Sequence, residues 1–375
     1  MIYTADKFGF YKVNDKKTYS KFEAFEWAKQ NNSKIKWIYN DDIFSQYDWT
    51  VEPEIDLWEL YKERARQIRN SYDYCVIWYS GGSDSHNILH AWLDAGCKID
   101  EIATTWNYKT TGELYNHQNA EITHVVLPDI EKLKKSGYDF KFRLIEIPEI
   151  SLKLFNVFST NLEYLFNFNF QISSVGKQFL RDEIQDYKNL INQGKKVCFI
   201  WGKEKPYLFF ENGKYYTHFA DSIDDCVGPY SQNKYKEGWY DEMFYWTPDF
   251  PILPIKMAHV VKNFLKLNQD KKYYNEIDYN IVKNEPINNR PPNKNMTLKI
   301  EIIKSILYPK WLNKIYCNGK SPTRIFGLRD DWFVKSNIHE LQKTKEALKN
   351  YLLTTNQNSK KSLMTFYSQK YWLEK

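Results

Sequence analysis

The chain of 375 residues is long enough to bury a sizeable core and to form two or three domains. Its 42% hydrophobic and 27% charged residues are typical of a soluble globular protein, and a net charge of +6 permits a nucleic-acid surface without requiring one. The first residues lack the apolar core of a signal peptide, and no stretch approaches the length of a membrane span. We therefore expect a cytoplasmic protein with no membrane partner.

Residues 1–55 have the pattern of a small α+β unit. Two strand-like runs, Phe8–Val13 and Lys34–Tyr39, flank a short helix that begins near Ser20. Apolar residues at helical spacing from Leu57 onward predict a longer helix before the first core strand.

The next part of the chain, 56–270, alternates between strand and helix patterns. Strands are predicted at 75–79, 99–106, 141–147 and 197–201. This alternation predicts an α/β fold with a mostly parallel sheet flanked by helices. Because ligands of such sheets bind at the carboxyl ends of the strands, the loops after these strands are the first places to look for a site.

Beyond the fourth strand the pattern changes. Residues 207–210 and 214–219 flank an Asn-Gly turn and predict an antiparallel hairpin, and a helix follows Pro254. The proline- and asparagine-rich run 283–294 predicts a linker. Residues 271–375 are expected to form a mainly helical C-terminal region.

The five cysteines are odd in number and widely spaced, and no Cys-x-x-Cys pair occurs. A common structural zinc site is therefore not expected. Cys75 and Cys198 stand inside apolar runs, which predicts reduced, buried thiols.

The most informative motif is Ser80-Gly81-Gly82-Ser83-Asp84-Ser85, which links the strand 75–79 to a helical pattern at 85–95. The N–H groups at a helix start bind anions, and glycines allow positive φ and close approach of a ligand. Ser80, Ser83 and Ser85 add hydroxyls, and Asp84 can hold a metal ion or orient the loop. A structural turn capped by serines is the alternative. The Walker loop and the Gly-x-Gly-x-x-Gly fingerprint are missing.

The hexapeptide resembles the PP-loop of the ATP pyrophosphatase superfamily, whose signature is Ser-Gly-Gly-x-Asp-Ser after the first core strand, and all five fixed positions match. The resemblance implies a HUP-like core that binds ATP with Mg²⁺, splits it between the α- and β-phosphates and passes AMP to an acceptor. Ser80 to Ser85 would bind the pyrophosphate, and Thr104 and Thr105 would lie near the adenine or ribose. More loosely, the whole chain looks similar to uncharacterised bacteriophage-type PP-loop proteins.

Two other groups could contact phosphate. Gly202-Lys203-Glu204-Lys205-Pro206 directly follows the fourth predicted strand, so Gly202, Lys203 and Lys205 could meet the ligand; a solvated turn is the alternative. Lys256 and His259, which follow the aromatic cluster 245–249, share one helix face. They could bind phosphate or transfer a proton, or be an exposed lysine and a core histidine.

Two weaker candidates concern metal binding. Asp221, Asp224 and Asp225 could bind magnesium, although acidic loops are usually solvated. His86 and His90 have the spacing of paired ligands, but the glutamate of the zinc-protease motif is absent, so we favour helix-surface or nucleotide-proximal histidines.

The sequence thus predicts an ATP-dependent, ligase-type adenylating enzyme with Asp84, Lys203 and Lys205 as catalytic residues and Asp84 as the Mg²⁺ ligand. The sequence does not identify the acceptor, and a nucleobase in tRNA or DNA is one candidate.

The lack of paired cysteines argues against the thiolating branch of the superfamily, and Cys317 does not resemble the reactive-cysteine motif of a sulfonucleotide reductase. A reductase-like member, a nucleotide-binding module without turnover and a nucleic-acid-binding accessory protein remain as alternatives.

Overall fold

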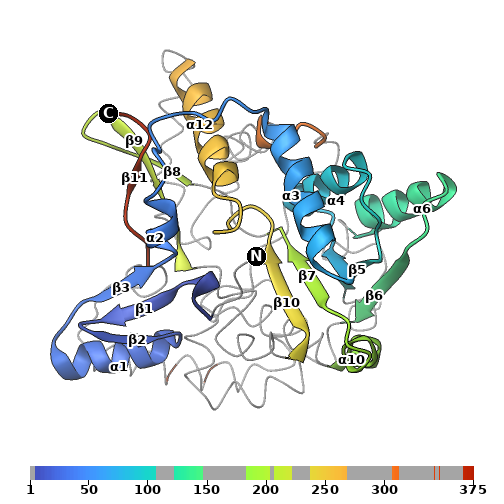
Figure 1. Cartoon of the computed structure of the whole chain (residues 1–375), viewed down its shortest axis with the longest axis horizontal. Coiled ribbons are helices and arrows are strands. Elements are labelled where there is room, and N and C mark those ends of the chain that lie inside the picture. The colour runs from blue at the N-terminus through green and yellow to red at the C-terminus, as the bar shows by residue number, and fades with distance from the viewer. Residues whose placement is uncertain are drawn as a thin grey trace.

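The computed structural model describes residues 5–106, 122–146, 183–202, 207–221, 237–267, 306–311 and 366–375, together with Gln342 and Glu346. The predicted linker and most of the predicted helical C-terminal region lie outside these residues. Figure 1 shows a large central sheet with helices beside it and two smaller sheets on one side.

The centre of the fold is a five-stranded sheet in which every strand pair is parallel. Its order is β10-β7-β4-β5-β6. The strands are β4 (Tyr74–Trp78), β5 (Glu101–Trp106), β6 (Lys141–Glu146), β7 (Val197–Trp201) and β10 (Trp239–Met243). The four predicted core strands and the α/β architecture are confirmed, whereas β10 was not among the predicted strands.

The strand order creates a reversal in the middle of the sheet. From β4 the chain adds β5 and β6 on one side, then returns to place β7 and β10 on the other side. β4 and β7 are therefore neighbours at the reversal point. In open parallel sheets, the ligand crevice lies outside the carboxyl ends of the strands at this point. The motif 80–85 follows β4, and Gly202 follows β7.

Helices precede or follow each strand of this sheet, and α3 and α4 pack against each other (Figure 1). The Asp56 carboxylate caps the start of α3 by accepting from the Trp58 N–H at 2.7 Å. A π-helical turn, η2, leads directly into α6, whose first turn holds Pro128, a position where a missing N–H is tolerated. The elements are α3 (Leu57–Ser71), α4 (Ser83–Asp94), η2 (Ile122–Val126), α6 (Leu127–Lys135), α10 (Gln185–Asn192) and α12 (Ile252–Leu267).

The N-terminal residues form the predicted α+β unit around a small antiparallel sheet of order β2-β1-β3. Ser20 is the N-cap of its helix, accepting from the Glu23 N–H at 3.2 Å. The buried Lys7 Nζ lies 2.7 Å from Glu242, so this unit is joined to β10 by an ion pair. Its elements are η1 (Ala5–Phe8), β1 (Phe10–Val13), β2 (Lys16–Thr18), α1 (Lys21–Asn31), β3 (Ile35–Ile38) and α2 (Asp41–Phe44).

The predicted hairpin is also confirmed. β8 (Tyr207–Glu211) and β9 (Lys214–His218) pair in antiparallel fashion, and the turn residues Asn212 and Gly213 have φ of 50° and 79°. Two positive φ values in succession are typical of the turns that match the twist of a hairpin. β11 (Tyr371–Trp372) joins the outer side of β9.

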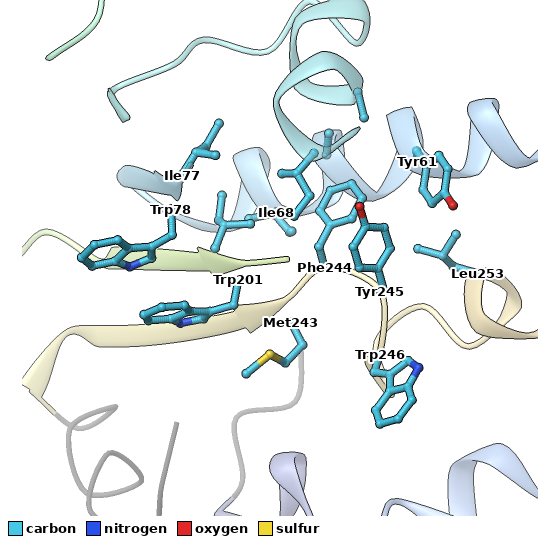
Figure 2. Close-up of a cluster of buried hydrophobic side chains, with 14 of the residues drawn as sticks. Tyr61, Ile68, Ile77, Trp78, Trp201, Met243, Phe244, Tyr245, Trp246 and Leu253 are labelled. Atoms are coloured by element: carbon cyan, nitrogen blue, oxygen red, sulfur yellow. The ribbon is translucent and has the colours of Figure 1, made fainter. Parts of the chain in front are cut away.

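Aromatic side chains account for much of the core. Trp78 and Trp201 stack on the neighbouring strands β4 and β7 with ring centroids 5.2 Å apart (Figure 2). Tyr61 and Tyr245 meet edge to face at 5.8 Å in the same cluster. Of the helices that the structure describes, none has the combination of length and apolar character needed to cross a membrane.

Candidate functional site

The motif 80–85 forms the turn from β4 into α4. Gly81 has φ of 76°, a conformation that residues with side chains rarely adopt. Gly82 is the N-cap of α4 and, having no side chain, provides no side-chain cap for the first turn. The first N–H groups of a helix have no carbonyl partner within it. The turn therefore presents the start of α4 at the carboxyl edge of the sheet. Neither Ser83 nor Ser85 is the N-cap, although the Ser80 hydroxyl accepts from the Gly82 N–H at 3.4 Å.

Ser85 holds the turn together. Its hydroxyl accepts from the Ser80 N–H at 3.1 Å and donates to the Gly82 carbonyl at 3.0 Å. Ser83 and Ser85 are buried, whereas Ser80 is exposed. Ser85 thus has a structural role in the turn, and the Ser80 side chain is the one accessible to a ligand.

Gly202 brings the turn after β7 against the motif. A Cβ atom on Gly202 would lie 3.0 Å from Ile88 Cδ1, 3.2 Å from the Asp84 carbonyl carbon and 3.2 Å from the Ser85 nitrogen. Only glycine fits at this place without displacing its neighbours. The structure therefore brings Gly202 together with the start of α4, at the reversal between β4 and β7.

Asp84 is held by tyrosines from distant parts of the chain. The Tyr308 hydroxyl donates to Asp84 Oδ1, and the Tyr245 hydroxyl donates to the Asp84 backbone carbonyl at 2.7 Å. Asn87 Nδ2 in turn donates to the Tyr245 hydroxyl at 3.2 Å. Burial raises the pKa of both phenols, so each stays protonated and remains a donor. These contacts give Asp84 a defined position beside the helix start.

Thr104 and Thr105 lie at the carboxyl end of β5, beside the motif. The Tyr79 N–H donates to the Ala103 carbonyl at 2.9 Å, which places the two threonines level with the residues that follow β4. Thr104 is buried and Thr105 is half-buried. The structure thus brings them to the same edge as Ser80.

His86, on the first turns of α4, belongs to a small polar cluster. The Tyr79 hydroxyl donates to the Asp129 carboxylate and lies 3.0 Å from His86 Nδ1. The His90 ring centroid lies 4.2 Å from that of His86. Burial, together with His86, lowers the pKa of His90 to about 4, so this ring is neutral at neutral pH. Within the described ranges, no three or more histidine, cysteine or acidic side chains gather as a metal site.

Lys256 and His259 both contact residues 49–53, and His259 Nδ1 also lies 2.9 Å from Lys262 Nζ. Lys256 Nζ lies 2.7 Å from Glu52 Oε1, and His259 Nε2 lies 2.9 Å from the Trp49 carbonyl oxygen. His259 is 1% exposed, and burial lowers its pKa. The core-histidine alternative therefore describes His259, and none of these contacts supports a phosphate-binding role for the pair. In the aromatic cluster 245–249 that precedes them, Tyr245 is the residue that reaches the motif.

Asp221 is not solvated, so the expectation of an ordinary acidic loop is wrong at this position. Its carboxylate is fully buried, lies 2.6 Å from Lys21 Nζ and accepts from the Tyr11 hydroxyl at 2.8 Å. These contacts join the N-terminal unit to the end of β9. Four other candidate site residues lie outside the described residues, namely Lys203, Lys205, Asp224 and Asp225.

The cysteine prediction is confirmed for the two thiols that it names. Cys75 and Cys198 are buried and free, and they stand opposite each other on β4 and β7. Burial raises the pKa of both thiols. They are therefore core residues on the strands that lead to the site.

Sequence reasoning missed Tyr308 and Asn87. Tyr308 lies 224 positions from the carboxylate that it contacts, and no local signal marks it. Asn87 follows the motif in the first turns of α4, and its position three residues after Asp84 on the same helix face could have identified it.

No protein-family model matches the chain, and no curated protein matches it. Function is therefore inferred from the residues and the geometry of the site itself.

Proposed function

We propose that the chain binds ATP with Mg²⁺ at the motif 80–85 and transfers AMP to an acceptor with release of pyrophosphate. One observation carries the proposal: a helix start that has no side-chain cap lies at the strand-order reversal, with Gly202 packed directly against it. A helix start of this kind favours phosphate, and this edge is where open parallel sheets bind ligands. The resemblance of the hexapeptide to the PP-loop supports ATP and the α–β position of cleavage.

The residues around the turn suit a triphosphate. The N–H groups of the first turn of α4 and the Ser80 hydroxyl are donors, and the positive end of the helix dipole attracts anions. Asp84 is the acidic residue of the motif and would hold Mg²⁺. Magnesium is commonly bound by one or two protein carboxylates plus substrate phosphates, so a single aspartate fits this role. When bound, Mg²⁺ would offset the charge of the pyrophosphate.

Transfer of AMP from ATP to an acceptor depends mainly on positioning of the reactants and electrostatic stabilisation of the transition state. An acceptor oxygen attacks the α-phosphorus, the bond from that phosphorus to the oxygen bridging to the β-phosphate breaks, and pyrophosphate leaves with the electron pair. Negative charge develops on the leaving group, where the N–H groups of the turn would stabilise it. Thr104 and Thr105 would contact the nucleoside, and we propose Lys203 and Lys205 as the catalytic cations.

Pyrophosphate production tests the proposal. The chain is incubated with ATP, Mg²⁺ and an acceptor panel of tRNA, DNA and small carboxylates. We expect pyrophosphate from the wild type and its loss in Ser80→Ala and Asp84→Ala. Glu131→Ala, an exposed change on α6, is the matched control and should behave as the wild type.

Two outcomes would contradict the proposed activity. Formation of ADP and phosphate would mean that a different bond of ATP is cleaved. ATP binding without pyrophosphate for any acceptor would identify a nucleotide-binding module without turnover.

A further inference from the structure

A segment far along the chain, 306–311, packs on the two helices beside the motif (Figure 1). Leu307 and Tyr308 are fully buried. The Tyr61 hydroxyl of α3 donates to the Leu307 carbonyl at 3.0 Å. Lys310 Nζ lies 3.2 Å from Asp94 Oδ2, at the end of α4. The segment is therefore held by both helices, and Tyr308, which contacts Asp84, lies between Leu307 and Lys310 in the chain.

The central contact of this segment is with Asp84. The Tyr308 hydroxyl donates to Asp84 Oδ1, and the Tyr308 ring lies 5.7 Å from the ring of Tyr245, which holds the Asp84 backbone. The side chain and the backbone of Asp84 are thus each held by a phenol. A carboxylate held in this way has fewer orientations than one on an exposed helix start.

We propose that Tyr308 is a positioning residue of the nucleotide site, whose hydroxyl orients the Asp84 carboxylate for the Mg²⁺ that accompanies the triphosphate. The inference rests on the proposed function. Carboxylates that bind metal ions are generally oriented by hydrogen bonds from an outer shell of residues, and loss of such a partner typically lowers metal affinity by about 10- to 100-fold.

The same hydrogen bond could act in the opposite sense, with Tyr308 blocking the cation. Two features favour positioning. A carboxylate accepts at about four lone-pair sites, so a phenol on one oxygen is compatible with a cation on the same group. Moreover, moving Tyr308 away would expose two fully buried side chains, Leu307 and Tyr308, and would break the contact with Tyr61. A displaceable blocking group would be held less firmly.

The test compares ATP affinity with Mg²⁺ and with EDTA, by calorimetry, in five forms of the full chain: the wild type, Tyr308→Phe, Tyr61→Phe, Asp84→Asn and the double variant. The ratio of the two affinities is the gain due to magnesium. In Tyr308→Phe we expect that gain to fall by about 10- to 100-fold, with metal-free affinity unchanged. Tyr61→Phe is the matched control, because it removes a phenol hydrogen bond to the same segment and leaves the Tyr308 hydrogen bond to Asp84 in place. Its gain should equal that of the wild type.

A double-mutant cycle with Asp84→Asn locates the effect. Asp84→Asn should itself remove most of the gain, and adding Tyr308→Phe should then change nothing further. Thermal unfolding of each form establishes that the variants are folded. Because Asp84→Asn changes the acceptor of the hydrogen bond, it tests the contact without altering the Tyr308 side chain.

The outcomes separate this inference from the proposed function. An unchanged or larger magnesium gain in Tyr308→Phe, in a chain whose wild type shows the gain, would overturn the positioning role alone. Equal losses in Tyr308→Phe and Tyr61→Phe would assign the effect to packing of the segment and would also overturn it. Absence of ATP binding, or of any magnesium gain, in the wild type would overturn both proposals.

Discussion

Replacing Gly202 with alanine places a methyl group against the start of α4. The added Cβ would lie 3.0 Å from Ile88 Cδ1 and 3.2 Å from both the Asp84 carbonyl carbon and the Ser85 nitrogen. Contacts of this length require the neighbours to move by a few tenths of an ångström. Ile88 can move its terminal methyl group. The two backbone atoms cannot move without shifting the turn that presents the helix start.

The size of the effect follows from this geometry. Forcing extra atoms into a packed site typically costs about 1–3 kcal/mol. If the motif moves to relieve the contact, the cost appears in ligand binding as well as in stability. We therefore expect Gly202→Ala to weaken ATP binding by about 5- to 150-fold, which is the affinity equivalent of that energy.

ATP titration and thermal unfolding measure the two effects separately. Gly194→Ala is the control, because Gly194 has φ of 79° with nothing within 4 Å of an added Cβ, so alanine there introduces backbone strain without a steric contact. Both variants should be less stable than the wild type, and only Gly202→Ala should lose ATP affinity. Adding Ile88→Val should restore part of the stability and little of the affinity, because the backbone contacts remain.

Unchanged ATP affinity in a destabilised Gly202→Ala chain would refute this reasoning. Equal losses of affinity in Gly202→Ala and Gly194→Ala would refute it as well, because they would show that affinity follows overall stability and not the position of the turn.

Further predictions concern buried groups of the fold. Glu242→Gln should lower the free energy of unfolding by about 3–5 kcal/mol in a denaturant titration, because Glu242 pairs at 2.7 Å with the buried Lys7 and Arg64. A loss of less than about 1 kcal/mol would contradict this. Burial alone would raise the pKa of Glu242, but Lys7 and Arg64 lower it below 4.5. The stabilisation from these ion pairs is therefore complete above pH 4.5 and is lost on acidification. Glu242→Gln should accordingly flatten the acid limb of the stability–pH profile. Burial raises the pKa of Cys75 to about 12 and that of Cys198 well above its usual value. Iodoacetamide should therefore label both thiols only when the chain unfolds. Rapid labelling of either cysteine in the native chain, located by mass spectrometry, would contradict this.

The core strands could be predicted where the signal is local. β4 and β7 are continuous apolar runs, as expected of strands buried on both faces of a parallel sheet. β10 has no such signal, because its sequence contains Asp241 and Glu242. Asp241 accepts from Trp201 Nε1 at 2.7 Å, and Glu242 is neutralised by cations from distant elements. Partners of this kind are fixed by tertiary structure, so a buried polar strand cannot be distinguished from a loop in advance.

The order of the strands was equally beyond prediction. Alternation of strands and helices favours parallel pairing but leaves open which strands are neighbours. The pairing of β4 with β7 brings Gly202 so close to the motif that an added Cβ would lie 3.2 Å from backbone atoms of Asp84 and Ser85. The sequence places Gly202 directly after a predicted strand, but it does not show that Gly202 packs against the motif 80–85.

In the candidate site, too, the local features could be predicted from the sequence and the tertiary contacts could not. Six consecutive residues, 80–85, specify the turn and the helix start, because a left-handed glycine and an N-cap depend on local conformation. The partners of Asp84 come from positions 161 and 224 residues away, and nothing near Tyr308 distinguishes it among the 29 tyrosines of the chain. Conversely, Lys256 has a spacing suited to phosphate, yet the fold pairs it with a glutamate. The motif therefore limits what the site can bind, whereas packing decides which side chains reach it. Gly202→Ala perturbs the turn and Tyr308→Phe perturbs a distant partner, so together they test these two contributions separately.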